Sequence, residues 1–168
     1  MYDLLKHDSE INHSKKNDSE QNPEAVIRDR VLNALALIHL SDIVFLKRND
    51  TPRERLAYGL LEFWLDHVYT PGLRYMDGLK GDRNEAEAAL FLESFSEEEF
   101  DWLERFNRFL ELRIDRLRPD DRTSNSFPIK DTWNGIVRDA GNLIALMEPD
   151  MYDGKKRLER VRKEIRAS

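Results

Sequence analysis

Signals that start helices recur along most of this sequence, and they constrain the fold more than any other feature. Asn22 and Pro23 combine a residue that caps helices with a proline suited to the first helical position. Residues 51–54 (TPRE), and Ser96 with Glu99, match the capping box, in which each side chain accepts a hydrogen bond from the other residue's free backbone N–H. The predicted helices span residues 23–48, 52–69, 83–95, 97–118, 132–148 and 151–166.

The spacing of apolar residues predicts an all-α fold. On 132–148 the apolar residues form one narrow stripe at helical spacing, which is typical of a helix that packs on its neighbours. The apolar arc of 23–48 is wider, so we expect this helix to be central. No segment keeps the alternation of a β-strand, and 168 residues is the length of one ordinary domain. We predict an all-α, single-domain bundle of five or six helices.

The composition divides the chain into three parts. Residues 1–22 are polar and offer little to bury, so we expect a flexible arm. Residues 23–150 form the predicted helical core domain, and residues 151–168 form a basic amphipathic C-terminal helix. Within the core we expect a short turn of helix in 71–79 and an irregular loop over 119–130.

Several classes of protein are excluded or disfavoured by composition. The chain has no cysteine, which excludes disulfides, zinc–thiolate sites and thiol catalysis and fits a reducing compartment. Its first residues are polar and acidic, unlike a secretory leader. The longest apolar stretch, residues 31–46, contains Asn33, His39 and Asp42 and is shorter than the about 20 apolar residues of a membrane span. We expect a cytoplasmic protein without a membrane partner.

Four polar residues fall inside the apolar arcs of the predicted helices. Asp42 and His39 lie in the arc of 23–48, His67 lies in that of 52–69, and Arg113 in that of 97–118. Because a lone buried charge is costly, we expect a buried polar cluster in which Asp42 pairs with Arg113. The cluster is either a structural ion pair that fixes how two helices meet or a binding or acid–base site at the centre of the bundle.

Motifs of metal and phosphate chemistry do not occur in the sequence. The di-iron bundles use two Glu-x-x-His pairs, which this sequence does not contain, and its seven glycines form no phosphate-binding loop. His39 and Asp42 have a spacing that one helix could use, but Asp66 and His67 are adjacent and point about 100° apart. We assign no catalytic residue, no metal ligand and no cofactor.

Positive charge is concentrated in the last helix. Residues 155–168 hold seven Lys and Arg against two Glu, a net charge of +5. Because the whole chain carries −6, residues 1–154 carry −11. Leu158, Val161 and Ile165 form a thin apolar stripe on this helix, so we expect an additional contact, with the acidic domain itself or with a partner. The predicted partner-binding residues are Lys155, Lys156, Arg157, Arg160, Arg162, Lys163 and Arg166.

No motif points to a known family, so the functional prediction rests on these features alone. The favoured interpretation is a non-enzymatic helical interaction module, such as an accessory or regulatory subunit, with a protein as partner. The first alternative is a nucleic-acid-associated subunit that uses the basic C-terminal helix. The second is a small helical enzyme or ligand binder built around Asp42, His67 and Arg113.

Overall fold

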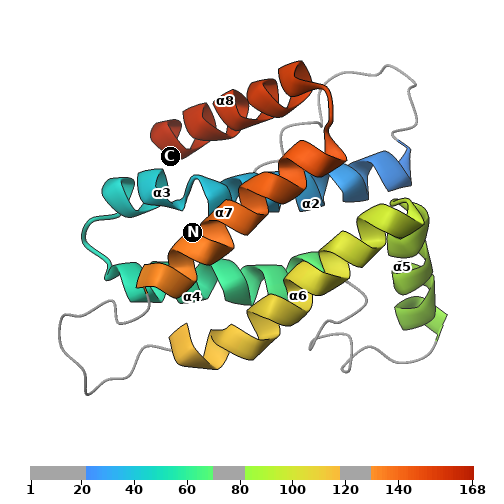
Figure 1. Cartoon of the computed structure of the whole chain (residues 1–168), viewed down its shortest axis with the longest axis horizontal. Helices are drawn as coiled ribbons and strands as arrows, with labels where there is room; N and C mark the ends of the chain where they lie inside the picture. The colour runs from blue at the N-terminus through green and yellow to red at the C-terminus, as the bar shows by residue number, and fades with distance from the viewer. Residues whose placement is uncertain (1–21, 70–81, 118–129) are drawn as a thin grey trace.

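The computed structural model describes residues 22–69, 82–117 and 130–168 (Figure 1). The predicted arm, apart from Asn22, the predicted turn in 71–79 and the predicted loop, apart from Lys130, lie outside these residues.

The described residues form seven α-helices and one π-helical turn and contain no strand, which confirms the all-α single-domain fold. The number of helices is slightly above the five or six predicted, because the segment 23–48 is two helices rather than one. The elements are α2 (Pro23–His39), α3 (Ser41–Lys47), α4 (Arg53–Phe63), η2 (Trp64–Val68), α5 (Asp82–Glu93), α6 (Glu97–Leu117), α7 (Lys130–Met147) and α8 (Met151–Ala167).

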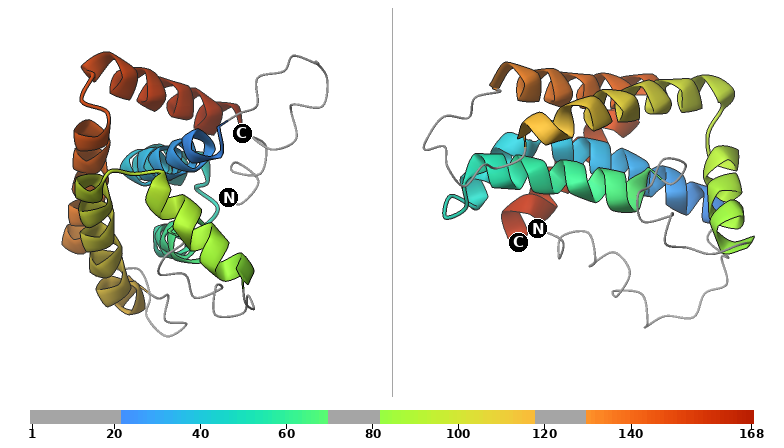
Figure 2. Two further views of the ribbon diagram at one scale, coloured as in Figure 1. Left: turned by 90° about the vertical axis from the view of Figure 1, so that its right-hand side faces the viewer. Right: turned by 90° about the horizontal axis from the view of Figure 1, so that it is seen from below.

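The helices pack in two main layers, and α2 is in contact with helices on several sides. Helices α6 and α7 form one layer, which crosses the layer of α2, α3 and α4 (Figure 2). Helix α8 lies along α2 and α3, and α5 packs against α2. The consecutive residues 34–38 of α2 are all buried, because helices cover α2 on several sides. The wide apolar arc therefore marked the central helix, as the sequence predicted.

The predicted side-chain caps form at two helix starts, whereas the capping box predicted for residues 51–54 does not form. The Asn22 side chain accepts a hydrogen bond from the backbone N–H of Glu24, and Pro23 is the first residue of α2. Ser96 and Glu99 form the expected reciprocal capping box at the start of α6. At α4 the N-cap is Pro52, and no side chain caps the helix.

The predicted helix 23–48 breaks at Leu40, where the backbone leaves the helical geometry (φ −94°, ψ 19°). Contacts with α7 hold both sides of the break. Before it, Nδ1 of His39 lies 3.0 Å from the carbonyl oxygen of Val137. After it, the buried indole N–H of Trp133 donates to the hydroxyl oxygen of Ser41 over 3.2 Å. The break thus comes from packing between helices, because the sequence around Leu40 contains no proline or glycine that would end a helix.

The end of the predicted helix 52–69 also departs from α geometry. Trp64–Val68 is a π-helical turn, which places more residues in a turn than an α-helix does. Inside it, the buried indole N–H of Trp64 donates to the side-chain oxygen of Asn107 on α6, over 3.1 Å. The amide nitrogen of Asn107 in turn donates to Glu111. The π-helical turn is therefore attached to α6 by a satisfied buried hydrogen bond.

Arg28 joins α2, α6 and α7. Its guanidinium makes a bidentate ion pair with Glu99 (2.6 and 2.8 Å) and donates to the backbone oxygen of Met147, near the end of α7. The hydrogen bond from Arg28, with those from the N–H and hydroxyl of Ser96 and the positive charge of Arg28, lowers the pKa of the Glu99 carboxyl, although partial burial opposes this effect. The capping glutamate of α6 thus also ties the helix to α2.

Within the described residues, no helix is both long and apolar enough to cross a membrane.

Candidate functional site

Helix α8 lies along the edge formed by α2 and α3 and also contacts α7 (Figure 1). Its buried side chains are Val161 and Ile165, with Leu158 half-buried beside them. Near its end, the ammonium of Lys47 on α3 donates to the backbone oxygen of Arg166 over 2.8 Å. A cation at this position also suits the negative end of the α8 dipole.

Arg157 provides the main polar attachment of α8 to the bundle. Only 12% of its side chain is exposed, and its guanidinium forms ion pairs of 2.6 Å with both Glu148, which follows α7, and Asp29 on α2. It also donates to the side-chain oxygen of Asn33 over 2.6 Å. The sequence predicted Arg157 as a partner-binding residue, whereas the structure shows its charge paired with acidic groups of the same molecule.

The electrostatics of Arg157 fit this internal role. Burial disfavours its charge, but the hydrogen bonds and charges of Glu148 and Asp29 outweigh burial, so the pKa of Arg157 is raised. Arg160 is half-exposed and contributes at the margin, donating to the side-chain oxygen of Asn33 over 2.9 Å, with Asp29 at 3.8 Å and Glu164 at 3.9 Å. The additional contact expected for this helix is therefore made, at least in part, with the acidic surface of its own domain.

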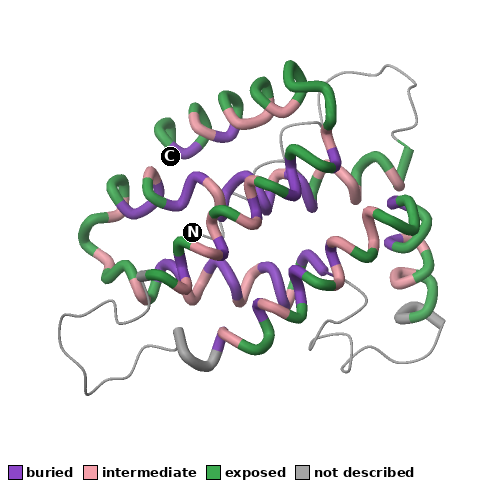
Figure 3. Tube along the Cα trace, viewed as in Figure 1, coloured by how far each residue is buried: buried purple, intermediate pink, exposed green. Residues whose placement is uncertain are grey.

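The remaining cations of α8 lie on its other side, and Figure 3 shows the exposed side of this helix turned away from the bundle. Among the described residues none of their side chains takes part in an ion pair. All are exposed except Arg162, which is half-buried. We call them the basic face, which consists of Lys155, Lys156, Arg162, Lys163 and Arg166.

Two further exposed residues share this side of α8. Tyr152 is 69% exposed and lies one turn before Lys155 and Lys156, with the ammonium of Lys156 at 5.6 Å from the centre of its ring. Glu159 is exposed and lies one turn before Lys163. Sequence reasoning missed Tyr152, although its spacing to Lys155 and Lys156 would have placed it on the same face.

The predicted burial of Asp42 is wrong, and so is its pairing with Arg113. Asp42 is exposed in the first turn of α3, where a carboxylate suits the positive end of the helix dipole. Arg113 is half-buried on α6, its guanidinium 3.5 Å above the centre of the Phe109 ring, and it donates to the backbone oxygen of the same residue. The predicted burial of Asp42 assumed that residues 23–48 form one continuous helix. The break at Leu40 changes the direction in which the residues after it face, and Asp42 is exposed.

Neither of the two predicted histidines lies in a buried polar cluster. His39 is half-buried at the end of α2, packed against α7. His67 is exposed within the π-helical turn, where its ring lies 5.5 Å from that of Phe63. The predicted residues thus occupy four different elements, and the structure does not gather them into a buried polar site. Among the described residues, no three histidine, aspartate or glutamate side chains are grouped as metal ligands would be.

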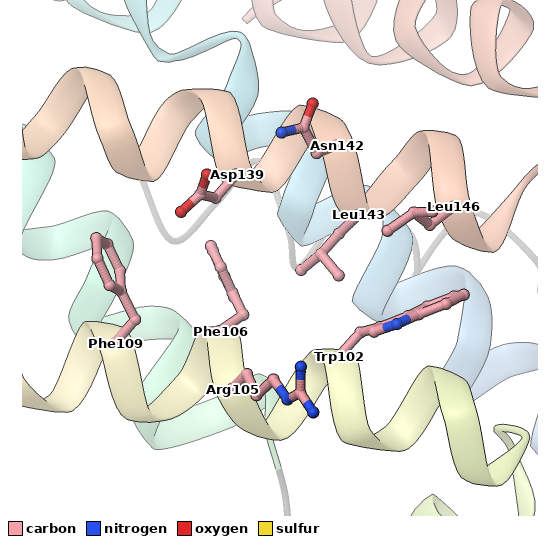
Figure 4. Close-up of a pocket in the computed structure, with 8 residues that line it drawn as sticks. All are labelled: Trp102, Arg105, Phe106, Phe109, Asp139, Asn142, Leu143 and Leu146. Atoms are coloured by element: carbon pink, nitrogen blue, oxygen red, sulfur yellow. The ribbon is translucent and has the colours of Figure 1, made fainter.

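A second surface feature is an open apolar groove between α6 and α7 (Figure 4). It has a volume of about 340 Å³, and Phe106 and Leu143 point into it from opposite helices. Leu146 is half-exposed at its edge, and Arg105, Asp139 and Asn142 supply charges of both signs and an amide. The groove can accept an apolar side chain, but its mixed polar groups do not specify what occupies it.

The chain gives no significant match to a family model, a curated protein or a solved structure. The functional proposal therefore rests on the geometry and charge of α8.

Proposed function

We propose that the protein is a non-enzymatic helical interaction module, an accessory or regulatory subunit that binds an anionic partner through the basic face of α8. The observation that carries the proposal is the division of charge on this helix. Arg157 forms ion pairs with acidic groups of the bundle, whereas the basic face makes no ion pair within the described residues. The bundle thus holds the helix in place, while Lys155, Lys156, Lys163 and Arg166 remain exposed and Arg162 lies half-buried at the border of the basic face.

Two physical principles favour binding through a charged helix that is already docked on the bundle. Binding costs less when the contact surface is already ordered, because side chains and backbone lose less freedom on association. A local positive field on a molecule of net charge −6 also steers an anionic partner to one place and one orientation. A helix docked by Arg157, Val161 and Ile165 supplies both features.

The test is capture of partners from an extract of the native cell. The full chain is compared with a variant in which four exposed cations of the basic face are neutralised: Lys155→Gln, Lys156→Gln, Lys163→Gln and Arg166→Gln. The matched control neutralises four exposed cations outside α8, which are Arg30, Arg53, Arg55 and Arg105.

A component retained by the wild type and by the control, but lost with the α8 variant, is the expected result. Retention should also weaken as salt is raised, because exposed charges are screened. Equal retention by the α8 variant and the wild type would contradict the proposed function.

A further inference from the structure

We infer that the basic face of α8 receives an acidic segment of a partner protein rather than nucleic acid, and that Tyr152 anchors this segment. The inference rests on the proposed function and names the chemistry of the partner. It is carried by the spacing of the cations, by Glu159 and the acidic surroundings, and by the exposed aromatic ring.

The cations form a short linear array. Lys155, Lys156, Lys163 and Arg166 recur at spacings that return to one side of a helix, and Arg162 lies at its border. From Lys155 to Arg166 the array spans roughly 17 Å at 1.5 Å per residue. This is the length of about three turns of a partner helix or five residues of an extended segment. A short segment with several Asp or Glu therefore fits the array.

Glu159 interrupts the array in a way that favours a protein. Its carboxylate is exposed between the cations that precede and follow it by about one turn. A phosphate backbone carries negative charge at regular intervals and would place some of it against Glu159. A polypeptide can place a hydroxyl, an amide or a cation there. A long polyanion would also extend past α8 toward a domain whose residues 1–154 carry −11.

Tyr152 gives the face an apolar contact that charge alone lacks. Its ring is exposed, and the first turn of α8 is capped by Asp150, whose side chain accepts from the backbone N–H of Tyr152 over 2.9 Å. The backbone that carries the ring is therefore ordered. Tyrosine is enriched among the residues that dominate protein interfaces, because it buries a large area for few rotatable bonds. An acidic segment with an aliphatic residue at one end matches this pairing.

The probes are a fluorescent peptide rich in glutamate and leucine and a fluorescent DNA duplex of similar length, each titrated with the full chain at physiological ionic strength. We expect saturable binding of the peptide, lost when the four exposed cations of the basic face are changed to Gln. Tyr152→Ala should weaken peptide binding by about tenfold, the scale of an interface anchor, whereas Tyr152→Phe should retain it. Leu112→Ala removes an equally exposed apolar side chain of α6 and should change nothing.

Tighter binding of DNA than of the peptide, absence of peptide binding, or unchanged affinity of Tyr152→Ala would overturn the inference. The proposed function is separable from it. If the four-site variant loses its partner from the cell extract while the peptide fails to bind, the proposed function stands and the inference falls. If the variant keeps its full set of partners from the extract, both fall.

Discussion

Two glycines of α7 have different neighbours, and the difference predicts opposite effects of the same substitution. A methyl group on Gly141 would lie 2.5 Å from Nδ1 and Cε1 of the His39 ring, whereas one on Gly135 would meet nothing within 4 Å. The ring of His39 has little freedom to move, since its Nδ1 lies 3.0 Å from the backbone oxygen of Val137. Gly141 is therefore the position that allows α2 and α7 to approach closely.

Gly141→Ala should lower the free energy of unfolding by about 1–3 kcal/mol, because the overpacked methyl group separates two helices of the core. Gly135→Ala on the same helix is the matched control and should raise it by up to about 1 kcal/mol, since alanine favours helix over glycine. Urea denaturation measures both values. An equal stabilisation by the two substitutions would show that the approach of α2 and α7 is not tight.

Arg157 should be the cation of α8 on which stability depends most. Arg157→Met leaves the largely buried Glu148 carboxylate without its partner, and we expect the free energy of unfolding to fall by about 3 kcal/mol. Lys163→Met changes an exposed cation of the same helix and should alter stability by less than about 0.5 kcal/mol. The comparison is made by urea denaturation at neutral pH, and equal effects would remove the internal role assigned to Arg157.

At the scale of single elements, the sequence predicted helices best where local chemistry determines them. The Asn22 cap and the Ser96–Glu99 box are formed as expected, because a cap depends on a few neighbouring residues. The break at Leu40 and the π-helical turn depend on contacts with α7 and α6, which no local pattern reports. These two deviations moved Asp42 and His67 to the surface, and with them the predicted buried cluster was lost.

The Glu99 cap gives α6 a pH-dependent attachment to α2. Hydrogen bonds from Arg28 chiefly lower the pKa of Glu99 below its ordinary value of 4.5, so the unfolded chain binds a proton at this group more readily than the folded one. The stability that Glu99 contributes is therefore fully present above pH 4.5 and is lost as pH falls through its folded pKa.

Glu99→Gln should accordingly lower the free energy of unfolding at pH 7, and the difference from the wild type should shrink as pH is lowered from 5 toward 3 (roughly the range over which glutamate titrates). Urea denaturation across this range measures the difference. Glu98→Gln removes an exposed charge from the same turn and should change stability by less than about 0.5 kcal/mol at pH 7. A Glu99→Gln difference that stays constant with pH would contradict the assignment.

At the scale of the whole molecule, composition predicted more of the fold than of the site. Helical spacing was enough for the all-α domain and for the central place of α2. The excess of positive charge also located the candidate surface, but the sequence could not tell which cations face the bundle. That distinction depends on Asp29, Asn33 and Glu148. Asp29 and Asn33 lie far from Arg157 in the sequence, and Glu148 precedes the helix that carries Arg157.

The central claim is that the basic face of α8 is not used to hold the molecule together and so remains available to a partner. The free energy of unfolding of the variant Lys155→Gln, Lys156→Gln, Lys163→Gln and Arg166→Gln, measured by urea denaturation, tests this claim most directly. These side chains make no ion pair among the described residues, so a change of less than about 1 kcal/mol is predicted. A loss of about 3 kcal/mol, equal to that expected for Arg157→Met, would show that these cations stabilise the fold and would contradict the claim.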